Sequence, residues 1–224
     1  MNPDDVAQYL QENPAFFEDY AEVLAQIQLP HPHGGRAIGL ADRQVLNLRE
    51  KHRALEAKLA ELLQFGEEND AISEKMHRLG LALLAAPSRD ALLWALKFNL
   101  REDFAIPHVA MRLWGMRPRE LDAGAEEYGE VSDALKNHAA SLAQPYCGAN
   151  NNAEAGGWFG EAAAQVRSAA YIPLRESVAG AGSGVCVGML ALGSEDAARF
   201  YAEMGTLYLA RLGELAGAGL TRFV

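Results

Sequence analysis

A long stretch without helix-breaking residues constrains this sequence more than any other feature. Between Leu40 and Ala86 there is no proline, and glycine occurs twice. Apolar residues recur there at spacings of three and four, which predicts one long helix. The first set has the spacing of a coiled-coil heptad and consists of Val45, Leu48, His52, Leu55, Leu59 and Leu62. We call these six residues the seam.

The seam is too narrow to stabilise a helix that stands away from a globular body. We therefore expect it to pair with a second copy in a parallel homodimeric coiled coil. A helix folded back on its own domain is the alternative. After one skip in register, a second apolar set follows, made of Phe65, Asn69, Ile72, Met76, Leu79 and Leu83.

Three segments are expected along the chain. We expect an acidic helical hairpin and linker at residues 1–35, a coiled-coil or signalling helix at 36–70, and a globular domain at 71–224. The first 29 residues carry six carboxylates and no Lys or Arg, and Asn-Pro pairs open each of two short predicted helices. Helices this short are marginal alone, so residues 1–30 either pack on their own chain or contact a protein partner.

The globular segment predicts an α+β fold, with helices on a face of an antiparallel sheet. The alternating residues 108–114 indicate a strand, and a glycine-rich turn favours a hairpin between two further strands. The other expected elements are strands at 169–175 and 185–193, helices at 131–144 and 196–217, and an irregular stretch at 145–160. Pro173 within a strand implies a bulge or an edge.

The charge balance excludes several classes of function. Twenty Lys and Arg against thirty Asp and Glu give a net charge of −10, which argues against direct nucleic-acid binding. No apolar run reaches the length of a membrane span, so we expect a cytoplasmic protein without membrane contact. Two cysteines do not form a disulfide framework, and no catalytic or metal-binding motif is found. We therefore expect no enzyme and no metal, and the cofactor is unknown.

A candidate ligand site centres on Arg112 and Trp114. They share one face of the strand at 108–114, opposite Val109, Met111 and Leu113. A guanidinium beside an aromatic wall suits an anionic, partly apolar molecule. The predicted ligand-binding residues are Arg112, Trp114, Tyr146, Cys147, Trp158 and Tyr171.

Each part of this site has an alternative interpretation. Arg112 and Trp114 can instead pack under the irregular stretch. Trp158 and Phe159 can form a lid over a cavity or the plug that fills it. Cys147, placed in a loop, is either a ligand-contacting or reactive thiol or a buried and inert one.

Two sets of residues carry a family resemblance. Tyr171–Arg175, Val187–Ser194, Asp196 and Arg199-Phe200 resemble the carboxy-terminal half of a GAF domain. The second set consists of Asn13-Pro14, Phe16-Phe17, Pro32–Gly35, Asp42–Gln44, Leu48–Glu50, Glu68–Asp70, Pro145–Gly148 and Met204–Leu207. Together this second set resembles the bacterial domain-of-unknown-function family 484 over nearly the whole chain. The resemblance implies a GAF-like sheet flanked by helices behind a helical extension, and no biochemical activity.

Three functions follow as expectations. The first is a non-catalytic regulatory protein that senses a small molecule and transmits through the dimeric helix. The second is a ligand-free scaffold or interaction protein with a filled pocket. The third is a cysteine-dependent reductase of the kind that GAF-like proteins provide for free methionine sulfoxide. Those enzymes use several cooperating cysteines, whereas this chain has two, Cys147 and Cys186.

Overall fold

The computed structural model describes residues 2–26, 28–29, 38–116, 124–176 and 184–223. The chain divides into two compact units, Met1–Glu68 and Asn69–Val224. The helix α4, Leu40–Ala85, runs through the boundary between them and confirms the predicted long helix. The expected breaker at 30–35 and the glycines at 180 and 182 lie outside the described residues.

The described residues that precede α4 form three short helices where two were predicted. These are α1 (Pro3–Glu12), α2 (Phe16–Asp19) and α3 (Ala21–Gln26), followed by paired two-residue strands β1 (Gln28–Leu29) and β2 (Ile38–Gly39). The predicted second helix is interrupted at Tyr20, whose backbone leaves the helical region at φ −117° and ψ 34°. The ring of Tyr20 stacks on that of Phe16, one turn earlier, with ring centroids 4.7 Å apart, so the residue at the break packs on α2.

The helices α1 and α2 bury little of their apolar surface. Tyr9 meets Phe16 edge to face at 6.4 Å, which joins α1 to α2. No residue of either helix is buried, and Tyr9 and Tyr20 are each half exposed. The first 29 residues therefore present aromatic side chains among their six carboxylates.

The second unit is built on a four-stranded antiparallel sheet in the order β3-β6-β5-β4. The strands are β3 (His108–Leu113), β4 (Tyr146–Ala149), β5 (Ser168–Arg175) and β6 (Cys186–Ser194). The helices are α5 (Arg89–Glu102), α6 (Asp133–Ser141), α7 (Ala153–Gly157) and α8 (Leu207–Thr221), with short 3-10 turns η2 (Glu126–Tyr128) and η3 (Gly160–Ala164). The predicted α+β class is confirmed.

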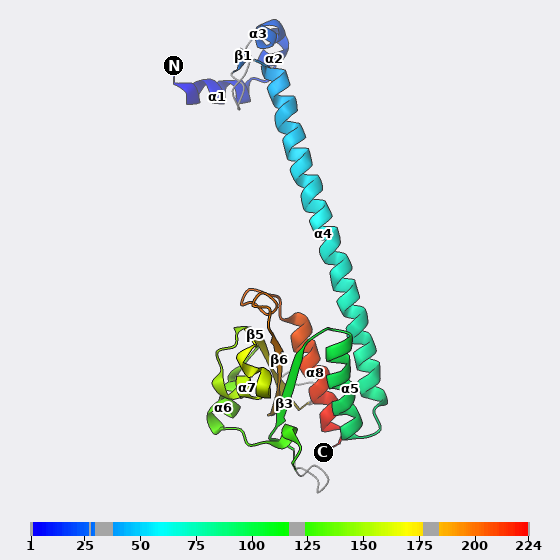
Figure 1. Cartoon of the computed structure of the whole chain (residues 1–224). Helices are drawn as coiled ribbons and strands as arrows, with labels where there is room; N and C mark the ends of the chain where they lie inside the picture. The colour runs from blue at the N-terminus through cyan, green and yellow to red at the C-terminus, as the bar shows by residue number, and fades with distance from the viewer. Residues whose placement is uncertain (1, 27, 30–37, 117–123, 177–183, 224) are drawn as a thin grey trace. The chain divides into compact units, whose positions relative to one another are not determined.

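Helices cover both faces of this sheet, not one as predicted. Figure 1 shows α5 and α8 on one side and α6 and α7 on the other. Apolar side chains of α4, α5 and α8 meet one face, where Leu79, Leu92 and Leu96 are fully buried. On the opposite face α6 contributes Leu135 and Ala139. The sheet therefore separates two apolar clusters.

Three predicted elements need correction. The stretch at 145–160 is not irregular: it contains β4, paired with β5, and the helix α7. The last helix begins at Leu207 and not near Asp196, because residues 196–206 form turns that bury Phe200 without helical structure. The helix expected at 131–144 is shorter, with Ser132 accepting a hydrogen bond from Leu135 N at its start.

The proline in β5 sits where the neighbouring strand has ended. Residues 168–171 of β5 pair with β4, so Pro173 pairs with β6 alone, opposite Met189. Its missing N–H therefore costs no bond to β4. The irregularity in register falls one residue later, between Leu174 and Arg175.

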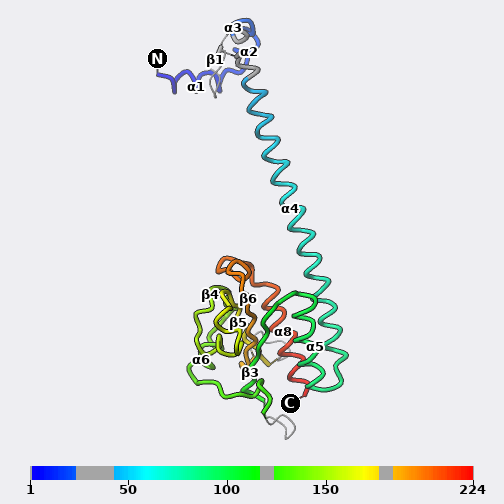
Figure 2. Tube along the Cα trace, in the orientation of Figure 1, coloured from blue at the N-terminus to red at the C-terminus, as the bar shows by residue number. Residues whose placement is uncertain are grey.

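The helix α8 lies very close to β5. Figure 2 shows α8 beside the strands of the second unit. A Cβ atom on Gly217 would lie 2.2 Å from the carbonyl oxygen of Arg175, and one on Gly213 would lie 2.7 Å from Ile172 Cγ2. The missing side chains let the helix backbone approach the strand. This contact fixes α8 on the sheet.

Candidate functional site

The predicted site lies on the sheet face covered by α6 and α7. Alternation along β3 places Ala110 with this face and Met111 with the other, as the sequence predicts. Small residues form the middle of the face, since Ala110 and Tyr171 both pair with Ala191, and Ala169 pairs with Gly193. The small side chains leave room above the sheet for larger groups.

Arg112 is held by groups of its own chain. Its Nη1 donates to the carbonyl oxygen of Met111 at 3.0 Å, and its Cζ lies 5.2 Å from the ring centroid of Trp158. Trp114, two residues along, donates from Nε1 to the carbonyl oxygen of Cys186 at 3.0 Å. The structure thus brings the guanidinium of Arg112 beside the predicted aromatic residues. Trp158 packs on this guanidinium, the group that the sequence analysis expected to meet a ligand.

The sequence analysis missed an acidic residue, Glu127, whose carboxylate interacts with the charges of Lys97 and Arg112. Lys97 on α5 donates to Glu127 on η2. Burial raises the pKa of Glu127, but the hydrogen bond from Lys97, a backbone hydrogen bond and the positive charges of Lys97 and Arg112 outweigh it, so the net pKa is lowered. The positive charge of Arg112 therefore acts on a carboxylate of its own chain.

Tyr171 forms the second half of the site with Asn150. The buried Tyr171 donates from its hydroxyl to Asn150 Oδ1 at 2.7 Å, and its ring stacks on Tyr146 at 5.6 Å. Burial and the neighbouring Tyr146 raise the pKa of Tyr171 to about 12. The phenol therefore stays neutral and serves as a hydrogen-bond donor at neutral pH.

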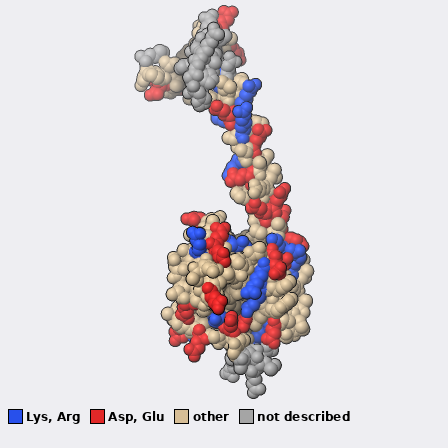
Figure 3. Space-filling view, viewed as in Figure 1, with Lys and Arg blue, Asp and Glu red and all other residues tan. Residues whose placement is uncertain are grey.

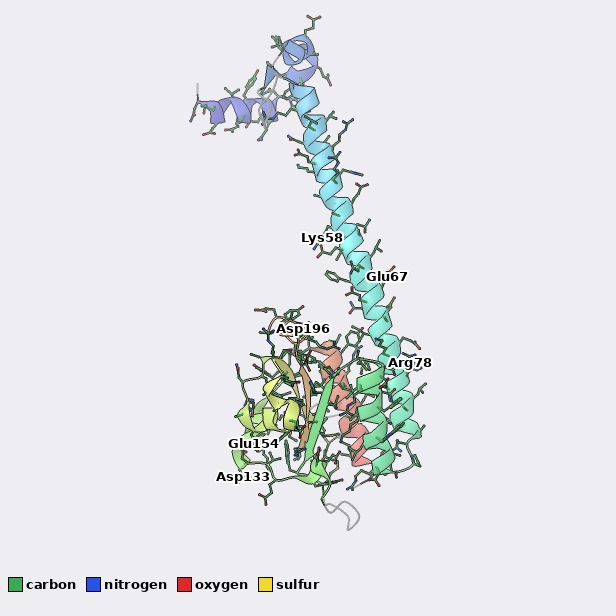
Figure 4. All side chains as sticks on the ribbon, viewed as in Figure 1. Lys58, Glu67, Arg78, Asp133, Glu154 and Asp196 are labelled. Atoms are coloured by element: carbon green, nitrogen blue, oxygen red, sulfur yellow. The ribbon has the colours of Figure 1, made fainter. Side chains whose placement is uncertain are left out.

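Phe159 fills the space above the small residues of the sheet. A Cβ atom on Gly193 would lie 2.9 Å from Phe159 Cζ, so the ring rests directly on this strand. Trp158 precedes it and packs on the same cluster. Glu154 anchors α7, because it accepts a hydrogen bond from Ser132 N at 2.8 Å at the start of α6, where Figure 4 shows Glu154 and Asp133 close to one another.

Cys147 is not part of this arrangement. It lies in β4 and not in a loop, and alternation turns it to the α5 and α8 side while Tyr146 faces the site. Burial raises the pKa of Cys147 to about 11, and it raises the pKa of Cys186 as well. The structure therefore brings together five of the six predicted residues and separates the sixth from them.

The prominent cavities of the described residues lie elsewhere than at the predicted site. Three prominent cavities of the described residues measure about 280, 280 and 610 Å³, and none is lined by any of the six predicted residues. No three His, Cys, Asp or Glu side chains within the described ranges are placed to hold a metal ion. The described arrangement is that of packed side chains joined by specific polar contacts.

The reactivity of the Cys147 thiol gives a direct test of its burial. At pH 8 a thiol of pKa about 11 is ionised about a hundredfold less than one of its usual value of 9.0, and only the thiolate is nucleophilic. We expect Cys147 to react with an aromatic disulfide at least a hundredfold more slowly in the native protein than after unfolding in guanidinium chloride. Cys147→Ser assigns the signal to its residue. Rapid reaction of the native protein would mean that the thiol is accessible.

The seam is exposed in the chain. Its five aliphatic members are 45–70% exposed, while His52 Nδ1 lies 3.3 Å from Glu56. Acidic and basic side chains are mixed along this part of α4 in Figure 3, as on the solvated flanks of a paired helix. The later apolar positions Met76, Leu79 and Leu83 are instead buried in the second unit.

Among the described helices, none combines the length and apolar character that a bilayer crossing requires.

The comparisons with known proteins give one family. The curated proteins contain no match to this chain. The family described as "Protein of unknown function, DUF484" matches residues 1–224, which is the whole sequence. The resemblance of Asn13-Pro14, Pro145–Gly148 and Met204–Leu207 to that family is therefore confirmed, and the chain belongs to the DUF484 family.

Proposed function

We propose that this protein is a non-catalytic, homodimeric interaction module whose α+β body is GAF-like and whose ligand site is filled by its own side chains. The observation that carries the proposal is the mutual engagement of Arg112 with Trp158 and of Tyr171 with Asn150. The contacts with Trp158 and with the Met111 carbonyl hold the guanidinium of Arg112 in place without a bound anion. The filled interpretation is the one that these contacts support.

The dimer part of the proposal is supported by the seam. Leu48, Leu55 and Leu59 follow heptad spacing, and each leaves more than half of its side chain in contact with water. Pairing with a second α4 removes these side chains from water and places them in the core of a coiled coil. The body and the acidic first unit then occur twice in each assembly.

The acidic first unit supports an interaction role. Its exposed Tyr9, Phe17 and Tyr20 stand among carboxylates and lie outside any buried core of their own. Aromatic side chains are enriched in protein interfaces, and the carboxylates favour a basic protein surface. We therefore assign residues 1–30 to contact with a protein partner.

Small-molecule sensing remains the competing function, because Trp158 and Phe159 are only half buried and form the outer side of the site. A sensor requires them to move and Arg112 to meet the charge of the ligand. Loss of one charge-assisted hydrogen bond typically costs about 1.5 to 3 kcal/mol, or roughly ten- to a hundredfold in affinity.

A thermal-shift screen of anionic metabolites on the wild type and on Arg112→Ala separates the two functions. We expect no compound to raise the melting temperature of either protein, and we expect the wild type to sediment at twice its chain mass of 24.2 kDa. A shift in the wild type that Arg112→Ala abolishes would support the sensor. A monomer at tens of micromolar would contradict the homodimer.

A further inference from the structure

An apolar groove lies on the second unit, away from the filled site. It runs between residues 73–84 of α4 and residues 211–218 of α8 and measures about 610 Å³. Leu81 and Leu84 on α4 are 54% and 70% exposed, and Leu215 on α8 is 37% exposed. Three large aliphatic side chains around one groove form a contiguous apolar surface, which marks an interaction site more often than single exposed residues do.

Hydrogen bonds at both ends of the groove join the two helices that form it. At one end the Tyr208 hydroxyl donates to the carbonyl oxygen of Asn69 at 3.1 Å and lies 2.7 Å from Ser73 Oγ. At the other end Arg222 donates from Nη1 to the carbonyl oxygen of Leu84 at 3.1 Å and from Nη2 to that of Ala86 at 3.1 Å. These bonds fix α8 against α4, so an occupant meets a preformed surface.

A helix from outside could approach the groove closely at Gly80. Gly80 lies in the interior of α4, where glycine costs about 1 kcal/mol relative to alanine. A Cβ atom at this position would meet no atom within 4 Å, so packing within the chain does not require the glycine. With Ala218 also on the groove, two small residues lie where a helix from outside would pack.

We propose that a second copy of this chain occupies the groove, so that α4 and α8 of two chains pack together and extend the homodimer interface beyond the seam. This inference rests on the dimer of the proposed function. Counting in sevens along the sequence from Leu59 gives Gly66, Ser73 and Gly80, and the last two line the groove. Although the apolar register skips once between Leu62 and Phe65, Ser73 and Gly80 lie close to the helix face that carries Leu59, beside Met76 and Leu83, which the second unit buries.

The charges at the groove also suit a second copy. Arg211 and Glu214 lie three residues apart on α8 at its edge. A two-fold axis brings the same surface of both chains together, so each Arg211 can face the Glu214 of the other chain. A nucleic acid is disfavoured here, because the chain carries a net charge of −10.

Cysteine cross-linking of the full chain tests the groove separately from the seam. The two native cysteines are buried, and the open space at Gly80 accommodates Gly80→Cys without displacing a neighbour. Leu48→Cys reports on the seam, and Glu102→Cys, at an exposed position near the end of α5, is the control away from both surfaces. We expect a short bis-maleimide to convert most of Gly80→Cys and Leu48→Cys into covalent dimers and to leave Glu102→Cys monomeric.

The outcomes distinguish the groove from the proposed function. Cross-linking of Leu48→Cys without Gly80→Cys would overturn the groove and leave the seam dimer standing. Cross-linking of Gly80→Cys alone would support the groove and contradict the seam. If neither variant cross-links above Glu102→Cys and the wild type sediments as a monomer, both proposals fail.

A charge substitution gives a second measurement. We expect Leu84→Glu to raise the dissociation constant of the dimer at least tenfold in sedimentation equilibrium. The matched variant is Leu207→Glu, because Leu207, at the start of α8, is likewise an exposed leucine (58%, against 70% for Leu84) but does not line the groove. Equal dissociation constants for the two variants would overturn the role of the groove.

Discussion

Leu55→Glu combined with Leu59→Glu is expected to convert the dimer into a monomer. Each buried leucine contributes about 1.5 to 3 kcal/mol. Two per chain, in two chains, therefore remove at least about 6 kcal/mol, which raises the dissociation constant about ten-thousandfold or more. Because both side chains are more than half exposed in the single chain, the body should keep its melting temperature. Sedimentation velocity and a thermal melt measure the two effects.

Ala54→Glu with Ala57→Glu provides the matched control. It adds the same two charges to the same turns of α4, at exposed positions on the side away from the seam. We expect this control to stay dimeric. If it dissociates as readily as the seam variant, net charge and not the leucines governs association, and the coiled-coil interpretation is wrong.

The long helix could be predicted from the sequence, but the partner of each half could not. Leu55, Leu59 and Leu62 are spaced by four and three residues, and Met76, Leu79 and Leu83 by three and four, so both sets have helical periodicity. Periodicity identifies the apolar face of a helix and carries no information about what covers that face. In the structure the later residues are buried within the second unit, whereas the earlier ones are exposed.

The sheet was predicted where strands are long and missed where one is short. β5 and β6 have eight and nine residues with continuous apolar character, and they pair as expected. β4 has four residues, of which Gly148 has low strand propensity, and its pairing with β5 determines its structure. Local pattern therefore gave no signal for this strand.

The missed strand accounts for the one misplaced site residue. Alternation in β3 correctly placed Arg112 and Trp114 opposite Met111, because that strand was recognised. Had β4 been recognised, the same alternation would have separated Cys147 from Tyr146. Asn150 and Glu127 carry no sequence signal, since each depends on contacts with residues 21 and 30 positions away.

Trp158→Ala is the variant that most directly tests the filled site. Truncation of a buried tryptophan costs about 3 to 5 kcal/mol, and because Trp158 is half buried we expect a loss of about 2 to 3 kcal/mol. The loss combines apolar contacts in the cluster over the sheet with the stacking on Arg112. Urea denaturation followed by circular dichroism measures the free energy of unfolding.

Trp94→Ala is the control for this measurement, because Trp94 is 65% exposed on α5 and contacts Phe98 by stacking at 4.8 Å. We expect it to cost less than about 1 kcal/mol, the scale of an exposed aromatic pair. If Trp158 fills the site, its side chain adds to the free energy of unfolding of the ligand-free protein, whereas the side chain of a lid adds little. If Trp158→Ala is no more destabilising than Trp94→Ala, the indole is not part of the packed core, and the filled-site proposal gives way to a lid that a ligand can displace.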